Sequence, residues 1–159
     1  MAELLELVIE APEWEQHVPD LEAFVTRVFS EAARAEALES VSVCVLLTHD
    51  AAMQALNSRW RGRDKPTNVL SFPAPEGGLL PGPRLLGNLA LGWGVVRAEA
   101  ESQGKPLAHH AAHLLVHGFL HLLGYDHQAE AQAAIMEARE VGILSRLDVP
   151  DPYLMQEPS

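Results

Sequence analysis

The stretch His-Gly-Phe-Leu-His-Leu-Leu-Gly-Tyr-Asp-His, residues 117–127, decides how this chain is interpreted. His117 and His121 are four residues apart, so on a helix their imidazoles lie one turn apart on one face, where a single metal ion can accept both. Gly124 can end that helix in a left-handed conformation without a Cβ penalty, and the chain can then bring His127 back toward the ion. Three protein ligands leave a fourth position for water, the pattern of a catalytic zinc and not of a closed structural one.

Other histidines on the same predicted helix, residues 107–123, compete for this role. His113 shares the stripe of His117 and His121, but its Cα would lie about 12 Å along the axis from that of His121, at ~1.5 Å per residue. One ion cannot easily reach both, so we place His113 behind the ligands or in the wall of the pocket. We expect His109 and His110 to be exposed residues near the start of the helix.

The spacing His-x-x-x-His-x-x-Gly-x-x-His is that of the metzincin metalloproteases. In those enzymes a glutamate follows the first histidine and acts as the general base, whereas this chain has Gly118 there. Glycine can neither take nor give a proton. The motif therefore predicts a metzincin-like helix in a hydrolase that activates water differently or acts on a different substrate.

Four cations gather upstream of the histidines, within seven residues. They are Arg59, Arg61, Arg63 and Lys65, out of only 11 lysines and arginines in the chain. A solvated turn and a phosphate-binding turn are both compatible with this cluster.

The formal net charge of −11 at first argues against nucleic acid, since phosphate binders are usually basic. The excess acid lies at the two ends. Residues 1–40 carry ten acids and two bases, residues 128–159 carry six and two, and residues 41–127 carry six and seven. The region with the basic turn and the histidines is therefore close to neutral.

Hydrophobic periodicity predicts four strands and five longer helices. The strands are expected at 4–10, 41–47, 68–72 and 85–91, and the helices at about 19–38, from a cap at Thr48 or Asp50 to about 60, and at 93–103, 107–123 and 129–147. This order predicts a single α+β domain over residues 1–159, with a small mixed four-stranded sheet packed with about five helices. The tail from about residue 150 is proline-rich and expected to be irregular.

Two features bear on the compartment. The first residues are acidic where a signal peptide would be basic, and no apolar stretch approaches the length of a membrane span. Cys44 lies in an apolar run without a partner for a disulfide, and we interpret it as a small buried hydrophobic residue. We expect a cytoplasmic protein that has no contact with a membrane.

Read with the segment upstream, the histidine run resembles the YbeY family of bacterial endoribonucleases. The upstream match is LNSRWRGRDKPTNVLSFP, residues 56–73. Further matches are Leu86-Gly87-Asn88-Leu89, Gln103-Gly104-Lys105-Pro106-Leu107, and Met136-Glu137 with Glu140. Together they cover most of residues 50–145 in one order, so the resemblance is highly specific.

The resemblance implies a single-strand-specific, metal-dependent endoribonuclease that matures the 3′ end of small-subunit rRNA and acts in ribosome quality control. It implies one zinc ion per chain on His117, His121 and His127, and a functional arginine at Arg61. Single-stranded rRNA, the ribosome or a ribosomal protein, and a GTPase of the Era type are the partners it suggests. One departure is Asn88, where family members usually have aspartate, and we expect this change to tune activity and not to abolish it.

A mechanism joins the two unusual features of the sequence. Zinc lowers the pKa of bound water to roughly 7, and Arg61 would supply positive charge to the phosphodiester transition state with a fork matched to phosphate oxygens. Pairing of Arg61 with Asp64 or Glu76 is the structural alternative. Arg59, Arg63 and Lys65 would hold the flanking RNA backbone.

Further assignments stay open. Asp126 orients an imidazole or caps a helix beginning near Gln128. Three aromatic residues either stack on unpaired RNA bases or belong to the hydrophobic core: Trp60, Phe72 and Trp93. Nickel and copper also suit three imidazoles. Two rival functions remain: a metalloprotease, and a non-enzymatic ribosome-assembly factor with zinc as a structural clip.

Overall fold

The computed structural model describes residues 5–75, 84–126 and 128–153, and its centre is one mixed sheet. The strands are β1 (Leu5–Ile9), β2 (Val41–Thr48), β3 (Val69–Pro73) and β4 (Arg84–Gly92). They lie in the order β1-β2-β4-β3, with β1, β2 and β4 parallel and β3 antiparallel to β4. The predicted small mixed sheet of four strands is confirmed.

The described residues form six helices around the sheet, one more than the sequence predicted. They are α1 (Glu13–His17), α2 (Leu21–Ala35), α3 (Asp50–Arg61), α4 (Trp93–Gln103), α5 (Leu107–Leu122) and α6 (Glu130–Arg146). The additional helix α1 is a single turn after Pro12, too short to show a hydrophobic period. Helix α1 is fixed against the end of β2, because the Trp14 indole N–H donates to the backbone carbonyl oxygen of Thr48 at 3.1 Å.

The central strand β2 shows why this sheet forms. Val41, Val43, Val45 and Leu47 are buried, while the residues between them are half-buried. That alternation gives the sheet one fully covered face and one partly open face. β-branched side chains at these positions also fit the pleated surface.

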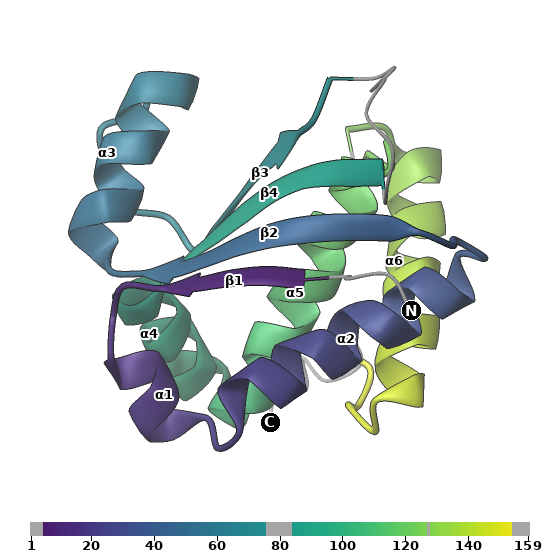
Figure 1. Cartoon of the computed structure of the whole chain (residues 1–159), viewed down its shortest axis with the longest axis horizontal. Coiled ribbons are helices and arrows are strands. Elements are labelled where there is room, and N and C mark those ends of the chain that lie inside the picture. The colour runs from purple at the N-terminus through teal and green to yellow at the C-terminus, as the bar shows by residue number, and fades with distance from the viewer. Residues whose placement is uncertain (1–4, 76–83, 127, 154–159) are drawn as a thin grey trace.

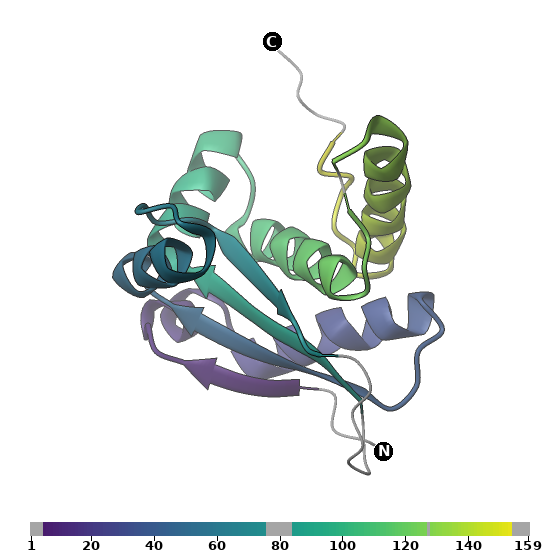
Figure 2. The same cartoon turned by 90° about the horizontal axis from the view of Figure 1, so that it is seen from above.

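Helices cover the two faces of the sheet unequally (Figures 1 and 2). The apolar helix α5 packs on β3 and β4 and is flanked by α2, α4 and α6, with the Phe29 and Phe119 rings 5.6 Å apart between α2 and α5. On the opposite face only the end near α3 is covered, through a small cluster of Met53, Leu70 and Ala90. The two faces therefore differ in what they offer to a ligand.

Within the part of the chain that the structure describes, no helix is long and apolar enough to cross a membrane.

Candidate active site

A cleft of about 600 Å³ is bordered by α5, β3 and the end of α3. It is lined by Trp60, Arg61, Thr67, Asn68, Val69, Leu70, Ser71, Phe72, Pro73, His117, His121, Asp126 and Gln128. The basic turn and the histidine helix, more than fifty residues apart in the sequence, thus meet across one opening. Arg61 lies on the same cleft as His117 and His121.

The histidine pair stands as its spacing predicts. Both residues lie on α5, and their ring centroids are 4.7 Å apart at an interplanar angle of 82°. After the helix ends, Gly124 takes a φ of +102° and the Tyr125 N–H donates to the carbonyl oxygen of Leu120 at 3.1 Å. The chain therefore leaves α5 at the predicted glycine.

His127 lies outside the described residues, so the third predicted ligand has no structural description. Among residues 5–75, 84–126 and 128–153, no group of three histidine, cysteine, aspartate or glutamate side chains could hold a metal ion. The donor chemistry of the described pair nevertheless suits a metal, because two half-buried imidazoles line the same cleft.

Glu140, on α6, connects the histidines from behind. Its side chain is fully buried, and it accepts hydrogen bonds from His117 Nδ1 at 2.5 Å and from His113 Nε2 at 3.1 Å. The Tyr153 hydroxyl donates to the same carboxylate. Since Nδ1 of His117 is committed to Glu140, a metal ion would be bound through Nε2, which is how carboxylates fix the tautomer of ligand histidines.

The charge of Glu140 is stabilised by these donors. Burial alone would raise its pKa, but the hydrogen bonds from His113, His117 and Tyr153 outweigh burial and lower the pKa to about 2. Burial and the bond to the carboxylate raise the pKa of Tyr153 well above its usual value. The glutamate is thus ionised and the tyrosine protonated throughout the neutral range.

Gly118 occupies the position of the metzincin base, and the structure shows why no side chain stands there. A Cβ on Gly118 would lie 2.7 Å from Leu89 Cδ2 and 3.2 Å from Ser71 Oγ. The position faces the sheet, and the missing side chain lets α5 approach β3 and β4 closely. A glutamate at 118 would meet the core instead of the cleft.

Arg61 is the last residue of α3 and is exposed. Gly62 follows with a φ of +72°, and the Asn57 side chain donates to the carbonyl oxygen of Lys65 at 2.9 Å, which fixes the turn. Among the described residues no carboxylate forms an ion pair with Arg61. Asp64, one predicted partner, instead accepts from Gln54 at 3.0 Å, and Glu76, the other, lies outside the described residues.

The four predicted substrate-binding residues lie outside the lining of the cleft. Arg59, Arg63 and Lys65 are exposed on and around the turn beside Arg61. His113 is on the α5 stripe but bonds Glu140 and Tyr153, and it faces two other hollows. The structure therefore places His113 behind His117.

The expectation for His110 was wrong. Its side chain is buried and pairs with Glu99 at 2.9 Å, and Asn68 donates to the same carboxylate at 3.0 Å. Desolvation lowers the pKa of His110 and outweighs the opposing effect of Glu99. His109 is half-buried. The sequence missed this contact because Glu99 belongs to a different helix.

The structure decides two alternatives that the sequence left open, for Asp126 and Trp93, and corrects the expectation that Cys44 is buried. Asp126 does not cap α6, since the N-cap position is Ala129. Trp93 is buried and packs edge-on against Trp14 at 5.2 Å, so it cannot stack on RNA bases. Cys44 is half-buried, and its thiol donates to Glu6 at 3.3 Å on the open face of the sheet. Asn88 lies on that open face as well and does not line the histidine cleft.

Two residues of the site carried no predicted role. Glu140 appeared only as a family match, and Tyr153 fell in the tail expected to be irregular. Their side chains reach the histidines from positions 23 and 40 residues away along the chain, so no local spacing signals them.

The structure thus places a histidine pair and an arginine on one open cleft of a four-stranded α+β domain, and these donors suit a metal-dependent hydrolase of anionic substrates. Comparison with known proteins makes this specific, since the model of the family described as Endoribonuclease YbeY matches residues 8–148. The chain belongs to the YbeY endoribonuclease family.

Relatives named Endoribonuclease YbeY support this membership. The protein of Bradyrhizobium diazoefficiens is 49% identical, over 94% of this chain and 85% of its own length. That of Bradyrhizobium sp. strain BTAi1 is also 49% identical, over 96% and 93%. A Thermotoga maritima protein with a known solution structure shares the fold, with a TM-score of 0.59 at 20% identity, over 91% of this chain and 92% of its own.

These findings confirm the predicted family, the α+β fold and the class of enzyme, an endoribonuclease that acts on RNA.

Proposed function

We propose that this protein is a zinc-dependent endoribonuclease specific for single-stranded RNA, acting in maturation of the 3′ end of small-subunit rRNA and in ribosome quality control. The observation that carries the proposal is the cleft that brings Arg61 to His117 and His121 in a YbeY-family fold. The ribosome, a ribosomal protein and an Era-type GTPase are the partners proposed with this role.

The zinc would be held by His117 and His121, with His127 as the third ligand proposed from the sequence. Bound there, it would act as a Lewis acid and make water nucleophilic at neutral pH. Glu140 orients His117 through Nδ1 and is itself held by His113 and Tyr153. This arrangement supports a site whose ligand is oriented before the metal binds.

Arg61 binds the phosphodiester and neutralises charge that develops on its oxygens. Its guanidinium offers several N–H donors in a planar fork, which matches phosphate geometry. The turn that carries it is fixed by Gly62 and by the Asn57–Lys65 hydrogen bond. A fixed donor stabilises a transition state better than one that must be ordered during the reaction.

The orientation of Gly118 argues against the protease alternative. Position 118 faces Leu89 and Ser71, so this helix has no room for a base of the metzincin kind. Asp126 is the only carboxylate among the described residues of the cleft lining. Asp126 lines the cleft and precedes His127 in the sequence. We propose that its carboxylate orients an imidazole of the site.

The test is cleavage of a single-stranded RNA and of the same sequence in a duplex by purified protein. Three conditions are compared: protein as isolated, protein with a chelator, and chelated protein with zinc restored. We expect cleavage of the single strand only, its loss on chelation and its return with zinc. Equal cleavage of the duplex would contradict single-strand specificity, and cleavage that persists with chelator would contradict metal dependence.

A further inference from the structure

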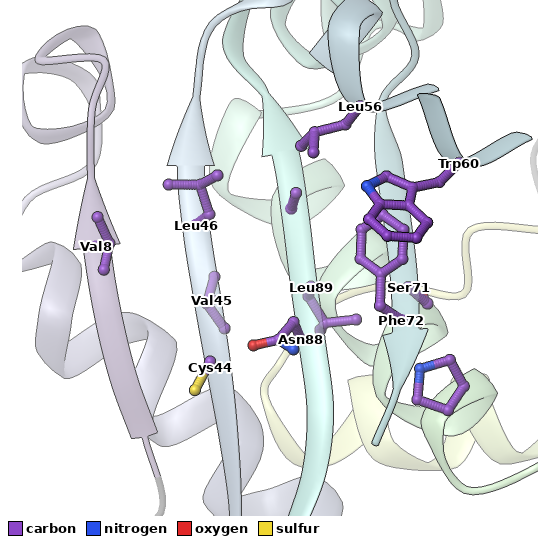
Figure 3. A pocket seen from close by; sticks show the side chains of 12 residues that line it. Val8, Cys44, Val45, Leu46, Leu56, Trp60, Ser71, Phe72, Asn88 and Leu89 are labelled. Carbon is purple, nitrogen blue, oxygen red and sulfur yellow. The ribbon is translucent and has the colours of Figure 1, made fainter. Parts of the chain in front are cut away.

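A second hollow, of about 670 Å³, lies on the open face of the sheet beside the histidine cleft (Figure 3). Its lining is Val8, Cys44, Val45, Leu46, Leu56, Trp60, Ser71, Phe72, Pro73, Asn88, Leu89 and Ala90. Most of these side chains are apolar, and helix α3 covers only one end of this face (Figure 2). The proposed chemistry at the histidines does not use this hollow.

The hollow and the cleft adjoin each other. Trp60, Ser71, Phe72 and Pro73 line both. Strand β3 forms the ridge between them, because successive side chains of a strand point to opposite faces. A strand of RNA with its phosphate at Arg61 would therefore pass directly beside the hollow.

Two aromatic rings stand at this junction. Trp60 is 61% exposed, and its ring centroid lies 6.3 Å from that of Phe72 at an interplanar angle of 64°. The guanidinium carbon of Arg59 lies 5.2 Å from the centre of the Trp60 ring. An exposed indole beside a cation offers a face for stacking together with a charge for the neighbouring phosphate.

Asn88 supplies a polar group within this apolar lining. It lies on β4, and Figure 3 shows its amide on the same face as Cys44 and Leu46. Among the described residues its side chain has no hydrogen-bond partner, whereas the Cys44 thiol is engaged with Glu6. An amide carries both donors and an acceptor, the combination that pairs with the edge of a base.

We propose that this hollow binds one unpaired nucleobase of the RNA strand whose phosphate lies at Arg61. The exposed Trp60 indole stacks on the base, and Phe72, whose ring is inclined at 64° to the indole, packs against the side of the base. Asn88 contacts its edge, and Arg59 faces the adjoining phosphate. The inference rests on the proposed function and deepens it. A base in a duplex is stacked and paired and cannot enter, so the hollow also gives a physical reason for preferring single strands.

A peptide segment or a second copy of the chain would also cover apolar surface. The adjoining cleft, the cation beside Trp60 and the amide of Asn88 favour a base over either of these.

The experiment measures binding of a short single-stranded RNA with phosphorothioate linkages to the zinc-loaded protein, by fluorescence anisotropy. The same RNA is then tested with an abasic nucleotide at each position in turn. Wild type is compared with Trp60→Leu and with Ile135→Ala. Ile135 is a matched control because it is a large apolar residue, 56% exposed, on α6 away from the hollow.

For wild type and Ile135→Ala we expect one position at which losing the base weakens binding about tenfold, the size typical of one base stack. Trp60→Leu should bind the intact RNA about tenfold more weakly and lose the difference between intact and abasic RNA. The proposal is overturned if no position is sensitive, or if Trp60→Leu keeps the full difference. A concentration-dependent dimer abolished by Trp60→Leu in light scattering would assign the hollow to a second copy and also overturn it.

Cleavage of unmodified RNA separates this proposal from the proposed function. Trp60→Leu should raise KM and leave kcat close to that of wild type. Failure of wild type to cleave would overturn the proposed function, while the binding comparison would still decide whether the hollow holds a base.

Discussion

The two sides of the histidine cleft treat polar groups in opposite ways. On the α5 face, Glu140 is fully buried and its carboxylate accepts from His113, His117 and Tyr153. On the side formed by the end of α3, Arg61 and Trp60 are exposed, and the hydrogen bond from Asn57 to Lys65 fixes the turn beside them. A metal ligand needs one orientation, which burial and hydrogen bonds impose, whereas a residue that receives a polymer must remain accessible.

This difference also divides the energetic roles. A buried carboxylate is tolerated only if its donors are complete, so removing one should affect both folding and the histidines. An exposed arginine contributes little to stability, so its removal should affect catalysis alone. Substitutions on the two sides of the cleft test that division.

Replacing Arg61 with alanine should lower kcat for RNA cleavage by about 10²–10³-fold, the usual effect of losing one donor to the transition state. Thermal unfolding should be nearly unchanged, because Arg61 is exposed and unpaired with any described carboxylate. Steady-state cleavage kinetics give the result. Arg97→Ala is the control, since Arg97 is an exposed cation on α4 whose partner is Glu101. A kcat for Arg61→Ala equal to that of Arg97→Ala would remove Arg61 from the mechanism.

Replacing Glu140 with glutamine should weaken zinc binding by about 10–100-fold, because the amide presents donors where His113, His117 and Tyr153 already donate. The free energy of unfolding should also fall by about 1–3 kcal/mol, the cost of unmatched buried polar groups. Zinc titration and chemical denaturation measure the two effects. Glu137→Gln, exposed on the same helix, should change neither. Unaltered zinc affinity in Glu140→Gln would limit Glu140 to a structural role.

Two helical glycines, Gly118 on α5 and Gly142 on α6, form a matched pair that tests how tightly α5 packs on the sheet. Alanine at Gly142 meets nothing within 4 Å, so helix propensity alone should stabilise the protein by about 1 kcal/mol. Alanine at Gly118 gains the same propensity but meets Leu89 Cδ2 at 2.7 Å, and overpacking costs about 1–3 kcal/mol. Chemical denaturation should show Gly118→Ala as the less stable of the two. The reverse order would mean that α5 does not need this close approach.

His110 gives the smallest effect, and it depends on pH. Because desolvation lowers its folded pKa below the unfolded value of about 6.5, the unfolded chain binds more protons in mildly acidic solution. Its contribution therefore destabilises the fold as the pH falls below about 6.5. Glu99, His113 and Lys105 are the charged or titratable groups that act on it. Unfolding free energies between pH 7 and pH 5 should fall less steeply for His110→Gln than for wild type, and equal slopes would contradict the assignment.

Much of the fold could be predicted because its signals are local. The alternation in β2 and the glycine after α5 each specify structure within a few residues. Caps were less predictable. Asp50, expected to cap α3, accepts from the Val95 N–H at 3.1 Å at the start of α4, and His49 stands at the α3 cap instead. Asp50 reaches α4 because Gly94 has no Cβ to collide with its carboxylate, which depends on two segments meeting in space.

The residues of the candidate site likewise fall into those that local motifs predict and those that only tertiary packing brings together. The His117–His121 pair and the Arg61 turn are each visible as short motifs, and the family resemblance assigns both to one site. Glu140 and Tyr153 were not assigned, because they reach the histidines through tertiary packing of α6 and the following turn. The burial of His110 escaped prediction for the same reason, since it depends on Glu99 in another helix.

The central claim is that the α5 histidines hold the metal with which this protein cleaves RNA. The most direct measurement determines bound zinc and cleavage of single-stranded RNA together, for wild type, His117→Ala and His109→Ala. His109 is a half-buried histidine on the same helix that lies outside the cleft lining. We predict that His117→Ala loses both zinc and cleavage while His109→Ala keeps both. Zinc and cleavage retained by a folded His117→Ala protein would contradict the claim.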